Sequence, residues 1–167
     1  MKTLDSIHKV LDKVISFIMI FLFIVMVVVG SYQIITRYFF NSPSTVSEEL
    51  LTYTFTWMAL FAAAYVFGKR DHMRMSFMAD KIVGKKRMVL EVAIECLIIV
   101  FAGVVMIYGG VSIVKLTMTQ ITASLGIHMG YVYLVVPVVG TCMVIYSIIN
   151  IARLLKQGEN VGKEVEG

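Results

Sequence analysis

Charged residues are scarce in this sequence. Asp, Glu, Lys and Arg make up only 16% of its 167 residues, whereas hydrophobic residues make up 59%. A typical soluble domain is about a quarter charged and about half apolar, so the polar residues here are too few to cover a soluble core of this size. The apolar residues also fall in long uncharged blocks. The composition therefore excludes a soluble domain and predicts a single integral membrane domain.

Cysteines, histidines and catalytic motifs are also scarce. The two cysteines, Cys96 and Cys142, lie inside apolar blocks without a CxxC pair and are expected to be packed thiols. The three histidines, His8, His72 and His128, lie outside those blocks, which argues against a haem held between membrane helices. No HExxH, GxSxG, P-loop or zinc-ligand spacing is present. We therefore expect no enzyme activity, no cofactor and no metal site.

Four apolar blocks are long enough to cross a membrane as helices: residues 14–36, 50–68, 88–114 and 131–152. About 20 apolar residues cross the hydrocarbon as an α-helix, in which the backbone polar groups satisfy one another. The first block is too long for a signal-peptide core and no A-x-A site follows, so we expect a retained membrane anchor. Pro137 is expected to kink the fourth helix. The predicted fold class is an all-α integral membrane protein.

Two shorter segments, residues 3–13 and 74–84, have the pattern of amphipathic surface helices. In each segment apolar residues recur at helical spacing, and charged residues occupy the other side. In the first segment Asp12 lies among the charged residues on the polar side. We expect both segments to lie among the lipid headgroups, with a specific protein partner as the alternative for each.

Lys and Arg residues are divided unevenly between the two ends of the predicted helices. Thirteen lie in the N-terminal segment, the 69–87 loop and the C-terminal tail, whereas two lie in the 37–49 and 115–130 loops. Basic residues accumulate on the cytoplasmic side of membrane proteins. We therefore expect both termini in the cytoplasm, and we interpret the net charge of +4 as a sign of orientation, not of nucleic-acid binding.

Glu91 and Glu95 are the acidic residues within a predicted span. They lie one helical turn apart, with Arg87 one turn earlier, so the three share a helix face. At 1.5 Å per residue Glu95 lies roughly 10 Å past the start of its span, and an acid inside the membrane is a functional candidate. We favour a structural ion pair or hydrogen bond, with Arg87 or another subunit as the donor.

Glu48 and Glu49 open the second span, where Thr45 and Glu48 have the spacing of a capping box. Arg37 ends the first span, and the connection between the two spans is short. We therefore predict that Arg37 pairs with one of the two glutamates. The other glutamate is expected to cap its helix or to face a partner protein.

The second span also carries two stripes of residues at helical spacing. The small residues are Thr52, Thr56, Ala59 and Ala63, and the aromatic residues are Tyr53, Trp57, Phe61 and Tyr65. Small residues favour the close packing of membrane helices. For the aromatic stripe, contact with lipid or with another helix is favoured over a ligand site.

Several of these residues occur in an order that resembles a known family. A basic and aromatic run ends the first helix, an acidic pair opens the second, a tryptophan lies within it and a histidine follows. These residues are Arg37-Tyr38-Phe39-Phe40-Asn41, Glu48-Glu49, Trp57 and His72. Over nearly the whole chain the sequence resembles the small membrane subunit (DctQ-like) of tripartite ATP-independent periplasmic (TRAP) transporters. It departs at Val46, where the family often has tryptophan, and at Ser76, where an aspartate commonly follows the histidine.

The resemblance implies a role in transport across the bacterial inner membrane. In this family a large membrane subunit carries the substrate and sodium sites and moves as an elevator, while a periplasmic binding protein delivers an organic acid. The small subunit braces the large one as a scaffold. The implied substrate is an organic acid such as sialic acid or a C4-dicarboxylate, and the sialic-acid branch looks most similar. The candidate partner-interface or structural residues are Arg37, Glu48, Glu49, Trp57, His72, Arg87, Glu91 and Glu95.

Two other functions stay open at this stage. A stand-alone four-helix exporter is expected to carry an acid in the middle of its first span, and residues 14–36 contain no charge. A membrane anchor of a redox complex is expected to carry histidines within its helices, and the three histidines lie outside the predicted spans.

Overall fold

The computed structural model describes the backbone of residues 2–69 and 85–165, and the side chains of residues 6–69 and 89–155. These residues are helical apart from short connections and an isolated antiparallel bridge between Ile121 and His128. In chain order the helices are α1 (Lys2–Phe39), α2 (Thr45–Lys69), α4 (Lys85–Phe101), the π-helix η1 (Ala102–Gly109), α5 (Gly110–Thr117), α6 (Met129–Tyr133) and α7 (Val135–Val165).

Within the described residues, four helical stretches are long and apolar enough to cross a membrane. They are Ser6–Phe39, Thr45–Lys69, Val89–Thr117 and Met129–Leu155. Each corresponds to one of the four apolar blocks of the sequence, which confirms the all-α membrane fold. The segment at residues 3–13 continues into the first stretch without a break, since α1 begins at Lys2. The predicted helix at residues 74–84 lies outside the described residues.

The third and fourth spans are not regular α-helices throughout. Eight residues of the third span form the π-helix η1, which the apolar pattern of the sequence does not reveal. The fourth span is interrupted at Leu134, between α6 and α7. Pro137 follows three residues later and has no N–H to donate to the carbonyl of Tyr133. The predicted kink at Pro137 therefore corresponds to an interruption one turn before it.

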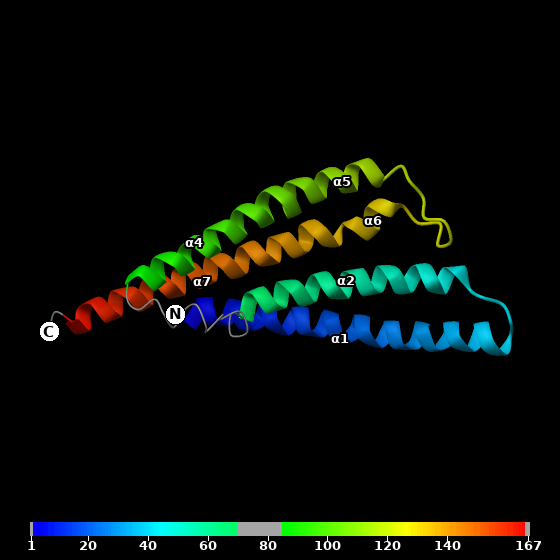
Figure 1. The fold of residues 1–167 in the computed structure, drawn as a ribbon, viewed down its shortest axis with the longest axis horizontal. Helices are drawn as coiled ribbons and strands as arrows, with labels where there is room; N and C mark the ends of the chain where they lie inside the picture. The colour runs from blue at the N-terminus through cyan, green and yellow to red at the C-terminus, as the bar shows by residue number, and fades with distance from the viewer. Residues whose placement is uncertain (1, 70–84, 166–167) are drawn as a thin grey trace.

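The helices form a single layer in the order α1, α2, α6–α7 and α4–η1–α5 (Figure 1). We call the end at which α1 begins the terminal end. The opposite end, with the connections at residues 40–44 and 118–128, is the loop end. The chain exposes 11664 Å², whereas a compact protein of 18.7 kDa exposes about 8300 Å². Among the residues that the structure describes, no helix covers the two broad faces of the layer.

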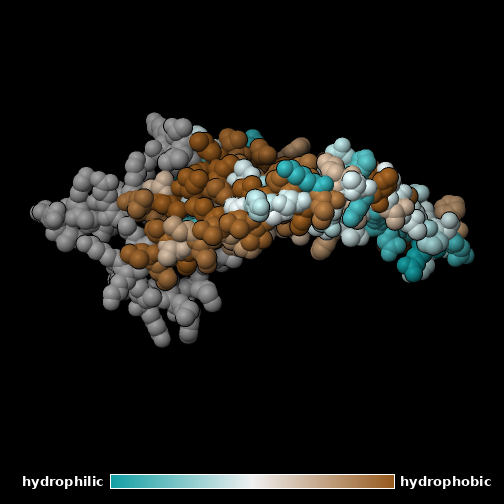
Figure 2. Space-filling view, turned by 90° about the horizontal axis from the view of Figure 1, so that it is seen from above, coloured by the Kyte–Doolittle hydropathy of each residue, from teal (hydrophilic) through white to brown (hydrophobic). Residues whose placement is uncertain are grey.

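The exposed faces are mainly apolar. Figure 2 looks onto the edge of the layer along which the third span lies. On this edge hydrophobic residues cover the middle of the molecule and hydrophilic residues gather toward the loop end. On α1, Phe17 is 71% exposed and Val28 is 62% exposed, and on the third span Leu97 is 70% exposed. Such side chains are stable in contact with lipid or with another membrane protein, because neither places them in water.

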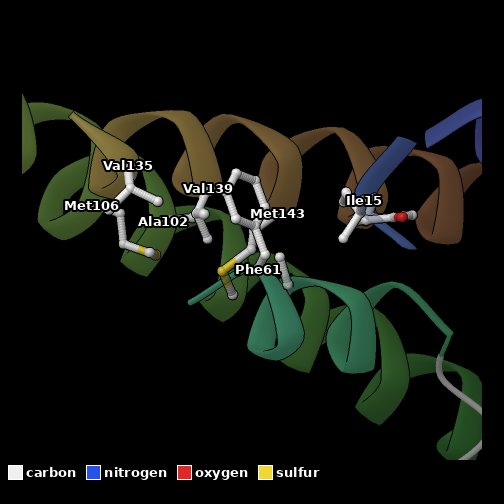
Figure 3. Close-up of a cluster of buried hydrophobic side chains, with 9 residues drawn as sticks. Ile15, Phe61, Ala102, Met106, Val135, Val139 and Met143 are labelled. Carbon is white, nitrogen blue, oxygen red and sulfur yellow. The ribbon is translucent and has the colours of Figure 1, made fainter. Parts of the chain in front are cut away.

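The apolar core lies where α7 faces its neighbours. Buried side chains come from all four spans: Ile15 of α1, Phe61 and Ala64 of α2, Ala102 and Met106 of η1, and Val135, Val139, Met143 and Tyr146 of α7. Figure 3 shows the α7 residues facing η1 along one stretch and Phe61 of α2 farther on. α7 is accordingly the central helix of the layer, because it packs on both α2 and the third span.

Two glycines allow the third and fourth spans to approach closely. A Cβ atom added at Gly140 of α7 would lie 2.7 Å from the Cβ of Met106 on η1. A Cβ added at Gly110 of α5 would lie 2.9 Å from the Cδ of Pro137. Small residues of this kind bring membrane helices into dispersion contact along their backbones. The spacing between η1 and α7 therefore depends on the absence of side chains at these positions.

The close packing at Gly140 predicts a sharp difference between two glycine substitutions. We expect Gly140→Ala to lower the free energy of unfolding by about 1–3 kcal/mol, because the added methyl group overpacks the contact with Met106. Gly103→Ala is the matched control, since a Cβ there meets nothing within 4 Å. Thermal unfolding of both purified variants in detergent measures the difference. Equal unfolding midpoints for the two variants would contradict this account of the η1–α7 contact.

Candidate functional site

The carboxylate of Glu49 joins the start of α2 to the connection between α5 and α6. Its Oε2 accepts hydrogen bonds from the backbone N–H groups of Ser124, at 2.7 Å, and Leu125, at 3.0 Å. Its Oε1 accepts a 2.6 Å hydrogen bond from the hydroxyl of Tyr53, one turn farther along α2. Hydrogen bonds to an ionised carboxylate are stronger than neutral ones. Glu49 therefore holds this connection against α2.

The connection itself is a small ordered hairpin. The N–H of Thr122 donates to the carbonyl of Ile127 at 2.8 Å, and the N–H of Met129 donates to the carbonyl of Gln120 at 2.9 Å. The side-chain oxygen of Thr122 accepts a further bond from the N–H of Ile127. Gly126 adopts a φ of 68°, a left-handed conformation that glycine takes without strain. The hairpin is thus closed by its own bonds and anchored by Glu49.

The predicted ion pair between Arg37 and a glutamate is not formed. In the part of the chain that the structure describes, no ion pair joins Arg37 to Glu48 or Glu49, and Arg37 and Glu48 are both exposed. The hairpin at residues 118–128 supplies the partners of Glu49 instead. Two backbone N–H groups in a fixed geometry satisfy a carboxylate without immobilising a long arginine side chain, which costs conformational entropy.

The predicted capping box is also displaced by one residue. α2 begins at Thr45, and the residue before it, Ser44, acts as the N-cap. Its side-chain oxygen accepts a 3.3 Å bond from the N–H of Ser47 and a 2.9 Å bond from the Ser47 hydroxyl. Glu48 therefore contributes its charge near the positive end of the helix dipole, without a capping contact of its own among the described residues.

The aromatic stripe of α2 faces another helix. Phe61 is buried, and Tyr53, Trp57 and Tyr65 are half-buried. The indole N–H of Trp57 donates a 2.9 Å hydrogen bond to the carbonyl of Val132 on α6. Since the interruption at Leu134 follows two residues later, this bond satisfies a carbonyl close to the point where the helix loses regularity. The stripe thus belongs to helix packing and not to a ligand pocket.

The small-residue stripe of α2 points away from the rest of the chain. Thr52, Thr56, Ala59 and Ala63 are all exposed. The two threonine hydroxyls donate to the carbonyls four residues earlier, at 3.0 Å and 2.8 Å, which keeps them satisfied in an apolar setting. The close packing expected of this stripe is therefore absent within the described chain.

Glu95 lies in a buried polar contact between α4 and α7. Its Oε1 accepts a 3.2 Å hydrogen bond from the side-chain amide of Asn150, and both residues are only 3% exposed. Ser147, one turn before Asn150, is equally buried. The sequence analysis named Arg87 or another subunit as the donor and missed Asn150. The side chain of Arg87 lies outside the described side chains, and Glu91 is half-buried.

A third polar contact, missed by the sequence analysis, lies at the terminal end. Asp12 of α1 is half-buried, and its Oδ1 accepts a 2.7 Å hydrogen bond from the hydroxyl of Tyr146 on α7. Its Oδ2 lies 3.1 Å from Nδ1 of His8. The expectation that Asp12 lies on an exposed polar side was wrong, because α7 covers it. The spacing of His8 and Asp12, four residues apart, was the available signal.

Two further sequence predictions concern His72 and metal binding. His72 lies outside the described residues. Among the residues that are described, no three His, Cys, Asp or Glu side chains are grouped in a way that could hold a metal ion. Hydrogen bonds of Trp57, Glu95 and Asp12 instead join α2, α4 and α1 to α6 or α7.

The anchoring role of Glu49 predicts a local effect on hydrogen exchange. We expect Glu49→Leu to speed exchange at the backbone amides of Ser124 and Leu125 by about tenfold or more, because losing a bond to a charged group costs about 1.5–3 kcal/mol. Glu48→Leu is the matched control, since Glu48 is exposed one residue away. Mass-spectrometric exchange over residues 118–130 measures the effect. The same exchange rate in both variants would show that Glu49 does not hold the hairpin.

Comparison with known proteins agrees with this architecture. Residues 26–157 match the model of the family described as "Tripartite ATP-independent periplasmic transporters, DctQ component". The chain is 28% identical, over 92% of its length and 88% of the relative's, to the sialic acid TRAP transporter small permease protein SiaQ of Vibrio cholerae.

Two relatives from Haemophilus influenzae are each named as a putative TRAP transporter small permease protein. One is 28% identical over 77% of this chain and 78% of its own length. The other is 21% identical over 90% of this chain and 91% of its own length. The family match covers most of the chain, including the end of the first span, α2 with its contacts to α6, and the third and fourth spans. The chain therefore belongs to the DctQ family, the small permease components of TRAP transporters, and is a multi-pass protein of the bacterial inner membrane.

Proposed function

We propose that this small permease subunit acts as a scaffold that braces the large membrane subunit of a TRAP transporter. The observation that carries the proposal is the single-layer architecture, which leaves both broad faces apolar and uncovered by any other described helix (Figure 1). A second membrane subunit can pack along such a face and gain dispersion contacts over several helices at once. The polar contacts inside the layer, at Glu49, Trp57 and Glu95, support the same role because they stiffen the chain without its partner.

The transported substrate belongs to the same proposal. The relative in Vibrio cholerae is named for sialic acid, so we propose sodium-coupled uptake of an organic acid, with sialic acid as the first candidate and C4-dicarboxylates as the second. In this arrangement the large subunit holds the substrate and sodium ions, and a periplasmic binding protein delivers the substrate. The chain described here then affects transport through the position of the large subunit.

We also propose that the terminal end faces the cytoplasm. Thirteen of the 15 basic residues lie in segments assigned to that side, as the distribution of basic residues in membrane proteins requires. The hairpin at residues 118–128 and the exposed Arg37 and Glu48 then face the periplasm. These two charged residues are the proposed contacts to the large subunit or to the binding protein at that surface.

The orientation predicts which positions a membrane-impermeant thiol reagent reaches in intact cells. With the cysteines of the spans replaced by alanine, we expect a cysteine at Ser42 to be labelled from outside and a cysteine at Lys163 only after the inner membrane is opened. The reason is that a thiol reacts only from the aqueous phase that it contacts. Labelling of the Lys163 position in intact cells would contradict the proposed orientation.

The scaffold role predicts that transport needs the other subunits. Vesicles containing this chain alone are expected to show no uptake driven by a sodium gradient, whereas vesicles that also contain the large subunit and receive the binding protein are expected to show uptake. The two membrane subunits should also be recovered together by affinity purification through either one. Sodium-driven uptake by this chain alone would contradict the proposal and favour a stand-alone transporter.

The double variant Arg37→Gln, Glu48→Gln tests the contacts at the loop end in the same vesicles. Since neither side chain has an ion-pair partner among the described residues, the isolated chain is expected to keep its stability. Reduced uptake with normal recovery of the large subunit indicates a contact with the binding protein. Reduced recovery indicates a contact with the large subunit, and unchanged values for both exclude the two residues from either interface.

A further inference from the structure

His8 is held between two hydrogen-bond acceptors at the terminal end. It lies on α1 and is only 8% exposed. Its Nε2 lies 3.2 Å from the backbone carbonyl oxygen of Gly68, near the end of α2. Its Nδ1 lies 3.1 Å from Oδ2 of Asp12, one turn later on α1. One imidazole ring thus contacts α1 and α2 at the same time.

The two contacts determine how many protons the ring can use. A carbonyl oxygen only accepts hydrogen bonds, so the bond to Gly68 requires a proton on Nε2. An ionised carboxylate also only accepts, so the bond to Asp12 requires a proton on Nδ1. Neutral histidine carries a proton on one nitrogen alone, and the other nitrogen would then turn its lone pair toward an oxygen. The site is therefore complementary to the imidazolium cation.

Asp12 has a second donor besides His8. The hydroxyl of Tyr146 on α7 donates to the second oxygen of Asp12 at 2.7 Å, so both carboxylate oxygens face donors. The titratable groups that interact with Asp12 or Tyr146 include Tyr65 on α2, with Lys69 beside it, and Cys142 on α7. The ammonium group of Lys69 lies over the Tyr65 ring, 4.8 Å from its centre. Asp12 is the acidic group in direct contact with His8.

Packing closes the site around the ring. The Tyr146 ring meets the His8 ring edge to face, with centroids 5.1 Å apart and an interplanar angle of 68°. A Cβ atom added at Gly68 would lie 2.7 Å from carbons of the Tyr146 ring. Because Gly68 has no side chain, the Tyr146 ring can approach the end of α2. The carbonyl of Gly68 is also the one that His8 contacts.

We propose that protonated His8 is a pH-dependent connection that holds α1, α2 and α7 together at the terminal end. While the ring carries both protons, it bonds to Gly68 and Asp12, and Asp12 bonds to Tyr146, so the three helices are linked. When the pH of the aqueous phase at this end rises and the ring loses one proton, one of its two bonds is lost. The stability that the connection contributes is thus complete at low pH and is lost as the pH rises.

The protonation state can be measured directly in the full-length chain. The protein is labelled with ¹⁵N at its histidines and reconstituted in lipid nanodiscs, and ring nitrogen resonances are recorded from about pH 5.5 to about pH 8.5. His8→Gln and His128→Gln assign the signals. We expect a form with both His8 nitrogens protonated within this range, and we expect Asp12→Asn to lower the fraction of that form. A wild-type His8 ring with a single proton throughout the range, or the same doubly protonated fraction in Asp12→Asn, overturns the proposal.

The consequence for stability is measured by thermal unfolding at the same pH values. The unfolding midpoint of the wild-type chain is expected to fall by at least about 2 °C between about pH 6 and about pH 8.5 relative to His8→Gln. His128→Gln is the matched control, because His128 is exposed at the opposite end, and it should follow the wild type. The same pH dependence in wild type and His8→Gln overturns the proposal. If His8→Gln does not fold, the wild-type nitrogen resonances alone test the proposal.

Discussion

α7 packs against η1 on one side and α2 on the other, and the arrangement of the whole layer follows from these two contacts. In a membrane the hydrophobic effect does not drive helices together, because lipid is as apolar as the side chains themselves. Association therefore depends on close contact between backbones and on a few polar bonds. Gly140 provides the close contact with Met106 on one side of α7, and Phe61 and Ala64 of α2 fill the other side.

Hydrogen bonds reinforce this packing at three positions along the length of the helices. Glu49 holds the hairpin at the loop end, Asn150 binds Glu95 inside the layer, and Asp12 binds Tyr146 at the terminal end. Each bond joins α6, α7 or the hairpin that precedes them to a different part of the chain. Since an unpaired polar group in hydrocarbon costs free energy, such bonds restrict how far the helices can slide or rotate.

A single layer of helices is a suitable shape for a subunit that supports another protein. It presents much apolar surface for its mass, and its two broad faces can contact lipid or a larger membrane subunit. This surface exists because α1 contacts mainly α2, and the third span contacts mainly α7, so no helix among the described residues covers the layer from above or below. The outward stripe at Thr52, Thr56, Ala59 and Ala63 is part of that uncovered surface.

The sequence by itself determined the class of the protein, its four spans and its family. Hydropathy is a property of consecutive residues, and about 20 apolar residues form a membrane helix whatever their neighbours are. The tertiary structure decided which polar groups meet. Arg37 was expected to bind either Glu48 or Glu49 because it is close to both in the sequence. Glu49 is instead bound by the backbone of Ser124 and Leu125, after the chain has crossed the membrane twice more. Asn150 likewise reaches Glu95, and Tyr146 reaches Asp12, only because α7 lies in the middle of the layer. Such partners depend on the order in which the helices pack, which a local pattern of residues does not contain.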